Sequence, residues 1–351
     1  MKEIGSIYSI PTLEKKECSP MKMAGSGATY FSLCREALLV IARRYRNSTK
    51  KVLIPAYTCQ TVLDPFFQEG WDIEYYNISK QLRIDIEDLT AKALSFQPTL
   101  CIAHPYYGAD LNEKELEGLR VLKLNGCVLI EDLTQCVFSK QHSSIFDYFV
   151  GSYRKWFPIP DGAFMIGSLD NNHEMQENVA FVEPMSDAMY LRGTFHKTGD
   201  NNIKEISRRV GNLAISHISG EIVPHKISVL STSLLNEIDV EETKRKRSDN
   251  YRYLYEQLSN RSICVPVERS LDELTCAPLF FPVYVKNRAL FQKRMAQQEI
   301  YAPVLWPVHT KELLINDTIK LMYDEILMLP IDQRYGKEDM KRMLEVILAI
   351  Q

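Results

Sequence analysis

The sequence lacks the patterns that mark membrane proteins, secreted proteins and zinc-binding modules. Its apolar runs are too short to cross a bilayer, and residues 1–20 interrupt their few apolar side chains with Lys, Glu and Pro, unlike a signal peptide. Its 8 cysteines contain no C-x-x-C pair, which is the spacing of zinc ribbons and dithiol redox motifs. We therefore expect a protein of the reducing cytoplasm, with no membrane span and no bound metal ion.

The sequence also lacks a strong charge of either sign. Its 42 Lys and Arg residues against 45 Asp and Glu residues leave a formal net charge of −3. No overall field therefore attracts a phosphate backbone, and nucleic acid is not an expected partner. No G-x-G-x-x-G follows an early strand, and GSG at residues 25–27 is too short a match. This absence argues against a nicotinamide-dependent oxidoreductase.

The composition is that of an ordinary globular protein. A chain of 351 residues exceeds the usual size of one compact core, which predicts one large domain and a smaller one. Hydrophobic residues make up 45% of the chain and charged residues 25%, which argues against disorder. We predict a large domain over residues 1–235 and a small carboxyl-terminal domain over residues 236–351.

Helical and strand-like stretches alternate between residues 30 and 150. The runs at 35–47 and 114–126 have the pattern of helices, and Gly126 closes the second of them. The runs at 71–78 and 98–108 read as strands, and CVLIED at 127–132 reads as a buried strand of a parallel sheet. Helices between parallel strands predict an α/β layer architecture, in which ligands bind at the carboxyl ends of the strands.

The rest of the chain has a different pattern. Residues 170–235 are mainly helical and polar, and a long charged helix begins near Asn236. Strand-like pieces follow at 264–267 and 277–285. The last predicted helices cover residues 288–299 and 337–350. This second pattern predicts a smaller α+β domain.

Two residues with complementary chemistry lie close to each other in the sequence. Asp132 closes an apolar strand, and Lys155 follows 23 residues later in a small-polar loop. Pyridoxal chemistry needs a lysine amine that attacks an aldehyde and a carboxylate that keeps the ring nitrogen protonated. As isolated residues they indicate little, because an Asp at a strand end is often a helix cap and a loop Lys is usually solvated.

The residues around this pair change that interpretation. IEDLTQ and GSYRKW resemble the cofactor motifs of the DegT/StrS-type aminotransferases, a branch of fold type I pyridoxal-phosphate enzymes that aminate keto sugars. The resemblance extends in the same order to SLCREAL, LIPAYTCQTV, HPYYG, YAPVLWP and LMLPIDQRY, and so covers most of the chain. It implies a fold type I architecture, in which a large domain with a mostly parallel sheet flanked by helices precedes a smaller α+β domain.

The resemblance also implies roles for individual residues. Lys155 would be the Schiff-base lysine, and Asp132 would pair with the pyridinium nitrogen of the cofactor. Gln135 would contact the phenolic oxygen, and Ser152 would bind the phosphate from a position closer to the lysine than in many relatives. Arg154 and Trp156 flank the lysine as anion-binding or packing residues.

Two departures and two further candidates complete the predicted site. Cys34 and Arg35 open the helix that would receive the phosphate, where many relatives carry glycine, which lets a phosphate approach the backbone closely. Cys59 stands where relatives carry an aromatic residue that stacks on the ring, and Tyr57 is either its substitute or a core residue. The remaining candidates, in HPYYG, are His104 and Tyr107.

The function that this resemblance implies is a ping-pong aminotransferase. Lys155 would release the cofactor to an amino donor such as glutamate and then act as general acid and base. The acceptor would be a keto sugar nucleotide or a similar carbonyl compound, in polysaccharide biosynthesis or a related pathway, and the enzyme would be a homodimer.

Two other interpretations stay open. One is a pyridoxal-phosphate enzyme of another type, such as a sugar dehydratase, although relatives of that type carry histidine in place of Lys155. The other is a catalytically silent regulatory or assembly protein, which the departures at Cys34 and Cys59 favour.

Overall fold

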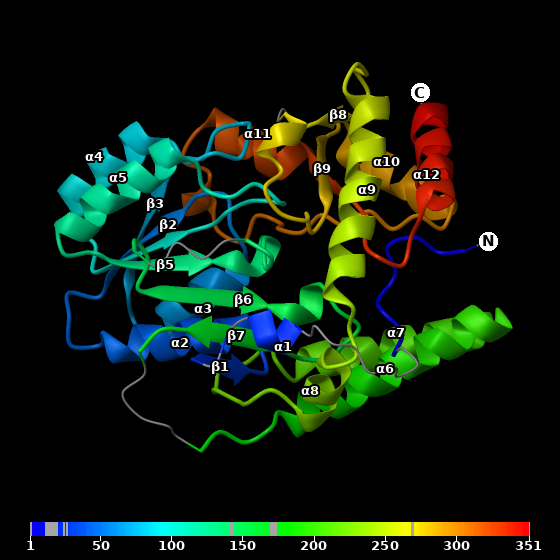
Figure 1. Cartoon of the computed structure of the whole chain (residues 1–351), viewed down its shortest axis with the longest axis horizontal. Helices are drawn as coiled ribbons and strands as arrows, with labels where there is room; N and C mark the ends of the chain where they lie inside the picture. The colour runs from blue at the N-terminus through cyan, green and yellow to red at the C-terminus, as the bar shows by residue number, and fades with distance from the viewer. Residues whose placement is uncertain are drawn as a thin grey trace.

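The computed structural model describes residues 2–10, 20–23, 25, 27–139, 144–168, 174–267 and 270–350. Figure 1 shows a large sheet with helices packed around it, and a second, smaller sheet beside the carboxyl-terminal helices. This arrangement confirms the predicted α/β architecture of the fold type I kind.

The larger sheet positions the candidate site. Within the described residues it has seven strands in the order β1-β7-β6-β5-β4-β2-β3. Strands β2 to β6 all run parallel, whereas β7 runs antiparallel to both β6 and β1. The strands are β1 Ala28–Phe31, β2 Lys51–Pro55, β3 Asp72–Tyr76, β4 Leu100–Ala103, β5 Val128–Asp132, β6 Tyr148–Ser152 and β7 Ala163–Ile166.

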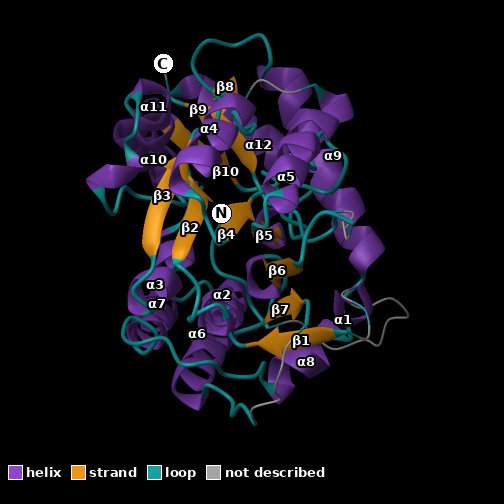
Figure 2. Cartoon of the chain, turned by 90° about the vertical axis from the view of Figure 1, so that its left-hand side faces the viewer, coloured by secondary structure: helices purple, strands orange, loops and turns teal. Residues whose placement is uncertain are grey.

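Helices cover both faces of this sheet. Figure 2 shows α2 and α3 on one face and α4 and α5 on the other. Because each strand is covered on two sides, a strand such as β5 is buried along nearly its whole length. The helices are α2 Cys34–Arg44, α3 Gln60–Gln68, α4 Ile86–Phe96 and α5 Glu113–Leu124, and the short α1 is Pro20–Met23.

Local sequence signals explain where α5 begins and ends. The side chain of Asn112 accepts a hydrogen bond from the backbone N–H of Glu115, and the Glu115 carboxylate accepts one from the backbone N–H of Asn112. This reciprocal cap satisfies two N–H groups that the helix leaves free. Gly126 follows the helix with φ of +86°, a conformation that side chains disfavour.

The second sheet has three antiparallel strands among the described residues, in the order β10-β9-β8. Strand β10, which was not predicted, overlaps the first three residues of LMLPIDQRY. The elements of this part are α9 Val240–Leu258, β8 Val265–Pro266, η3 Leu271–Glu273, β9 Phe281–Tyr284, α10 Arg288–Gln297, η4 Lys311–Leu313, α11 Asp317–Glu325, β10 Ile326–Leu329 and α12 Lys337–Ala349.

The amino-terminal segment packs with this second part of the chain. Ile4 is fully buried in the hydrophobic cluster of the smaller sheet and forms a parallel bridge with Ile300. In turn, Trp306 and Tyr323 from the second part of the chain pack in the hydrophobic core of the larger sheet. The boundary near residue 235 stays a prediction.

A helical hairpin joins the two parts. Helices α6 Val179–Thr198 and α7 Asn201–Ser216 pack along each other and extend to one side of the larger sheet, and the short α8 Val229–Leu235 follows (Figure 1). Across the described residues, none of the helices combines the length and the apolar character that a bilayer crossing requires.

Candidate active site

Four neighbouring parallel strands end at the same edge of the larger sheet, and polar side chains follow each of them. Thr58 follows β2, His104 follows β4, Asp132 is the last residue of β5, and Lys155 follows β6. All four line one cavity. This placement agrees with the rule that ligands bind outside the carboxyl ends of parallel strands.

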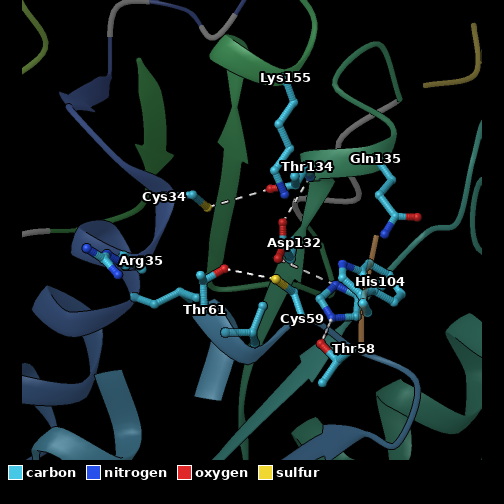
Figure 3. A pocket seen from close by; sticks show the side chains of 13 residues that line it. Cys34, Arg35, Thr58, Cys59, Thr61, His104, Asp132, Thr134, Gln135 and Lys155 are labelled. Atoms are coloured by element: carbon cyan, nitrogen blue, oxygen red, sulfur yellow. Dashed lines mark hydrogen bonds and ion pairs between the residues drawn. The ribbon is translucent and has the colours of Figure 1, made fainter. Parts of the chain in front are cut away.

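Asp132 is held by a chain of hydrogen bonds. Its carboxylate is almost fully buried and accepts a hydrogen bond of 2.9 Å from the backbone N–H of Thr134. Its other oxygen lies 3.5 Å from Nδ1 of His104, and Nε2 of that histidine lies 2.9 Å from the hydroxyl of Thr58 (Figure 3). These contacts fix the direction in which the carboxylate faces the cavity.

His104 is neutral at ordinary pH. Burial lowers the pKa of its imidazole, and the nearby Asp132 opposes this shift without reversing it. A neutral ring with its proton on Nδ1 donates to Asp132 and accepts from the Thr58 hydroxyl at Nε2, which matches both contacts.

Lys155 extends into the cavity from the short helix η2, Tyr153–Lys155. In Figure 3 its side chain points toward Asp132 and Thr134. The residues on both sides of it are anchored. Tyr153 donates from its hydroxyl to the carbonyl of Pro20, and the indole N–H of Trp156 donates to the carbonyl of Thr134 at 2.8 Å.

Gln135 faces the same cavity from the end of the short helix η1, Leu133–Gln135. The residue is 5% exposed, and within the described residues its buried side-chain oxygen has no hydrogen-bond partner. A buried polar atom without a partner is uncommon in folded proteins and is expected to bind a ligand or a water molecule.

The first turn of α2 forms another wall of the cavity, through Cys34 and Arg35. The side chain of Leu33 points elsewhere, because it packs with Phe181 and Val182 in a separate cluster. The Thr134 hydroxyl donates to the sulfur of Cys34 at 3.6 Å. Burial, with a further contribution from Asp132, raises the pKa of the Cys34 thiol, so this cysteine is a neutral thiol and not a thiolate nucleophile.

Of the remaining predicted residues, one lines the cavity and three do not. Cys59 lines the cavity at the beginning of α3. Tyr57, Tyr107 and Ser152 are buried and do not line it. Tyr57 packs in the core of the larger sheet, with its ring centroid 4.7 Å from that of Trp306.

Sequence reasoning missed several residues of the cavity wall. The aromatic ring of Trp306 comes from a loop about 150 residues after Lys155, and no local pattern assigns it to the site. Thr58 could have been found, because it directly follows the apolar run at residues 51–57, much as Asp132 ends the run at 127–132. The wall residues without an earlier assignment are Leu38, Thr58, Thr61, Val62, Thr134 and Trp306.

Comparisons with known proteins agree on the fold. No protein-family model matches the chain, and no curated protein matches its sequence. Among solved structures, the sugar aminotransferase CalS13 from Micromonospora echinospora is 13% identical, with a TM-score of 0.62, over 98% of this chain and 100% of CalS13. The aminotransferase TlmJ from Streptoalloteichus hindustanus is 12% identical, with a TM-score of 0.68, over 99% of each chain.

A third structure was solved with a cofactor. NtdA from Bacillus subtilis, with bound cofactor PMP, is 14% identical, with a TM-score of 0.64, over 92% of this chain and 73% of NtdA. Likeness at these identities establishes a shared fold, so the function has to be inferred from the residues of the cavity.

Proposed function

We propose that this protein is a pyridoxal-phosphate-dependent aminotransferase of the DegT/StrS type. One observation carries the proposal: Lys155 and Asp132, 23 residues apart in the sequence, line one cavity, and the lysine side chain extends toward the carboxylate (Figure 3). A covalent attachment point and a buried carboxylate in one cavity are the two groups that pyridoxal chemistry requires.

The residues around this pair fit the cofactor. Asp132 would face the ring nitrogen, and the side-chain amide of Gln135 would donate a hydrogen bond from its NH2 group to the phenolic oxygen. The first backbone N–H groups of α2, at Cys34 and Arg35, have no partner within the helix and suit a phosphate. The Leu33 side chain, which precedes this turn, packs away from this end of the cavity.

Different side chains would have different roles in the reaction. When bound, pyridoxal phosphate supplies an aldehyde that exchanges amino groups and a ring that takes up the electrons of the broken bond. Lys155 would hold the cofactor and then carry a proton on its amine nitrogen. His104 and the Thr134 amide hold Asp132 in place, and His104, being neutral, leaves the aspartate charge for the ring.

The substrates are proposed from the same resemblance. Glutamate is the amino donor, and the acceptor is a nucleotide-linked keto sugar or a similar carbonyl compound. The description of CalS13 as a sugar aminotransferase and the PMP bound to NtdA support this class of reaction. A homodimer in the cytoplasm, serving polysaccharide biosynthesis or a related pathway, is proposed on the same ground.

A visible absorption spectrum tests the proposal. Protein incubated with pyridoxal phosphate should develop a band that Lys155→Ala abolishes and that glutamate bleaches. Lys341→Ala, which removes an exposed lysine from α12, is the matched control and should keep the band. A Lys155-dependent band without bleaching would point to another donor or reaction type. The absence of any band in the unaltered protein would contradict the enzyme proposal and favour a catalytically silent protein.

A further inference from the structure

Two cysteines from different parts of the chain meet beside the candidate active site. Cys136 directly follows Gln135 at the end of η1, and Cys276 lies between η3 and β9. The thiol of Cys276 donates a hydrogen bond to the sulfur of Cys136. Both are free thiols, like the other cysteines in the described part of the chain. Residues about 140 positions apart in the sequence therefore have their sulfur atoms in contact.

Gly108, in the loop after β4, holds both cysteines in place. Its backbone N–H donates to the Cys136 sulfur at 3.1 Å, and its carbonyl accepts from the backbone N–H of Cys276 at 3.1 Å. Gly108 has φ of +90°, and a Cβ atom here would lie 2.8 Å from the carbonyl oxygen of Cys276. A side chain at this position would push the segment of Cys276 away, so glycine permits the close approach.

Further contacts hold the segment of Cys276 against the same loop. The backbone N–H of Asp110 donates to the Thr275 hydroxyl at 3.0 Å. Arg83, which lies between β3 and α4, pairs with Glu273 at 2.5 Å and donates to the Asp110 carbonyl at 2.7 Å. The contact between the two sulfur atoms therefore belongs to a fixed arrangement of three chain segments.

The two cysteines differ in their access to solvent. Cys136 is fully buried, and its thiol donates to the carbonyl of Pro105 at 3.3 Å. Cys276 is partly exposed. A small oxidant can therefore reach Cys276 first, with Cys136 in position to react second. An accessible thiol with a second thiol beside it is the arrangement of cysteines that form reversible disulfides.

The Cys276 thiol keeps its proton at neutral pH. Its hydrogen bond to Cys136 and its burial raise its pKa, and the nearby carboxylates of Asp110 and Glu131 raise it further. Because the thiolate reacts with oxidants and the thiol does not, oxidation should be slow at neutral pH and faster in alkaline buffer. The pair therefore stays reduced unless exposure to an oxidant is sustained.

We propose that Cys136 and Cys276 form a reversible disulfide that joins η1 to the second part of the chain under oxidising conditions. With hydrogen peroxide, the Cys276 sulfur attacks the O–O bond, which breaks to give a sulfenic acid and one molecule of water. The Cys136 sulfur then attacks the sulfenic sulfur, the S–O bond breaks, and a second water leaves. The two thiols lose two electrons and two protons, and the peroxide is reduced to water.

This proposal goes beyond the proposed function, because the disulfide forms without cofactor or substrate. It would close a loop of about 140 residues, and it would fasten the short helix that carries Gln135 to the segment before β9. A link across so long a loop restricts the unfolded chain and stabilises the folded one. We expect the midpoint of thermal unfolding to rise by roughly 5 to 10 °C.

Peptide mapping tests the pair. Protein without pyridoxal phosphate is treated with hydrogen peroxide in mildly alkaline buffer, its remaining thiols are blocked with a maleimide in denaturant, and its peptides are identified by mass spectrometry. The expected product links the peptides of Cys136 and Cys276, and dithiothreitol separates them. Cys136→Ala and Cys276→Ala should each abolish this product. Cys127→Ala, which removes another buried cysteine, is the matched control and should keep it.

Thermal unfolding tests the consequence of the link. The unaltered protein and Cys127→Ala should show the rise in midpoint after oxidation and lose it after dithiothreitol. Cys136→Ala and Cys276→Ala, both shown to be folded by circular dichroism before treatment, should show no such rise. An unchanged midpoint in protein that carries the link would overturn its role in joining the two parts of the chain.

Two results of the mapping would overturn the pair itself. One is a link between other cysteines, such as Cys34 and Cys59 of the cavity, in place of the expected one. The other is oxidation that leaves Cys136 and Cys276 reduced, or converts each to a separate sulfinic acid. The visible band of Lys155 is measured on untreated protein, so its absence would contradict the aminotransferase proposal and leave the disulfide proposal standing.

Discussion

At the scale of single residues, two histidines that each contact a carboxylate have pKa values shifted in opposite directions. His104 is buried beside Asp132, and burial lowers its pKa. His225 lies at the surface of the same region, where a hydrogen bond from its ring to Glu36 is the main reason that its pKa is raised. Both contact a carboxylate, so the degree of burial decides the sign of the shift.

These opposite shifts predict two separate titrations. In the protein without ligand, the ring signals of His104 should titrate below pH 6.5 and those of His225 above it. Nuclear magnetic resonance measures both, with His104→Gln and His225→Gln to assign the signals. A His104 ring that titrates at or above its ordinary pKa would show that Asp132 outweighs burial.

The same shifts give stability effects of opposite sign. The folded protein keeps His104 neutral, so its contribution to the free energy of unfolding is present above pH 6.5 and is lost as the pH falls below that value. The contribution of His225 is complete below pH 6.5 and is lost as the pH rises through the raised pKa of the folded state.

At the scale of elements, Arg247 of α9 ties the segment after Lys155 to the carboxyl-terminal part of the chain. The residue is 1% exposed and donates to the carbonyls of Leu279, at 2.8 Å, and Trp156, at 3.3 Å, and to the side chain of Gln333. Its guanidinium also lies 4.6 Å from the centroid of the Trp156 ring. The long charged helix of the sequence analysis therefore has one deeply buried cation.

Replacement of this cation should destabilise the protein. Arg247→Met removes this buried donor from the Leu279 carbonyl and from the Gln333 side-chain oxygen. It should lower the free energy of unfolding by about 3 kcal/mol, as expected when a buried charged partner is removed. The control on the same helix is Arg245→Met, an exposed residue paired with Asp249, which should change it by less than about 0.5 kcal/mol. Urea unfolding measures both, and equal effects would contradict this role for Arg247.

At the scale of the whole molecule, one buried carboxylate joins three regions. The Glu3 side chain is 2% exposed and lies 3.1 Å from Arg192 of α6 and 2.7 Å from Lys204 of α7. Lys204 in turn pairs with Glu299, which lies after α10. This network holds the helical hairpin against the part of the chain that forms the smaller sheet.

Neutralising Glu3 should therefore weaken the whole assembly. Glu3→Gln leaves Arg192 buried without its anion and should lower the free energy of unfolding by about 3 kcal/mol. This value is at the lower end for a buried pair, because Lys204 keeps its ion pair with Glu299. Lys2→Met removes a neighbouring exposed pair with Asp339 and should have little effect. Urea unfolding measures both variants. If the free energy of unfolding of Glu3→Gln falls only slightly, the result would contradict this role for Glu3.

The sequence alone predicts several of the helices and strands and the end of the sheet at which chemistry is possible. Local periodicity marks α2, α5 and β5, and Asp132 follows from the rule that strand ends carry functional groups. Those signals are local, because each depends on residues within one turn or one strand.

Only the tertiary structure decided which distant residues share the cavity. Trp306 reaches it from a loop about 150 residues after Lys155, whereas Tyr57, two residues before Cys59, packs in the core. Such contacts depend on long-range packing, in which residues far apart in the sequence compete for the same buried space. The strands β1, β6, β7 and β10 were also not predicted, since segments of four or five residues carry little periodicity of their own.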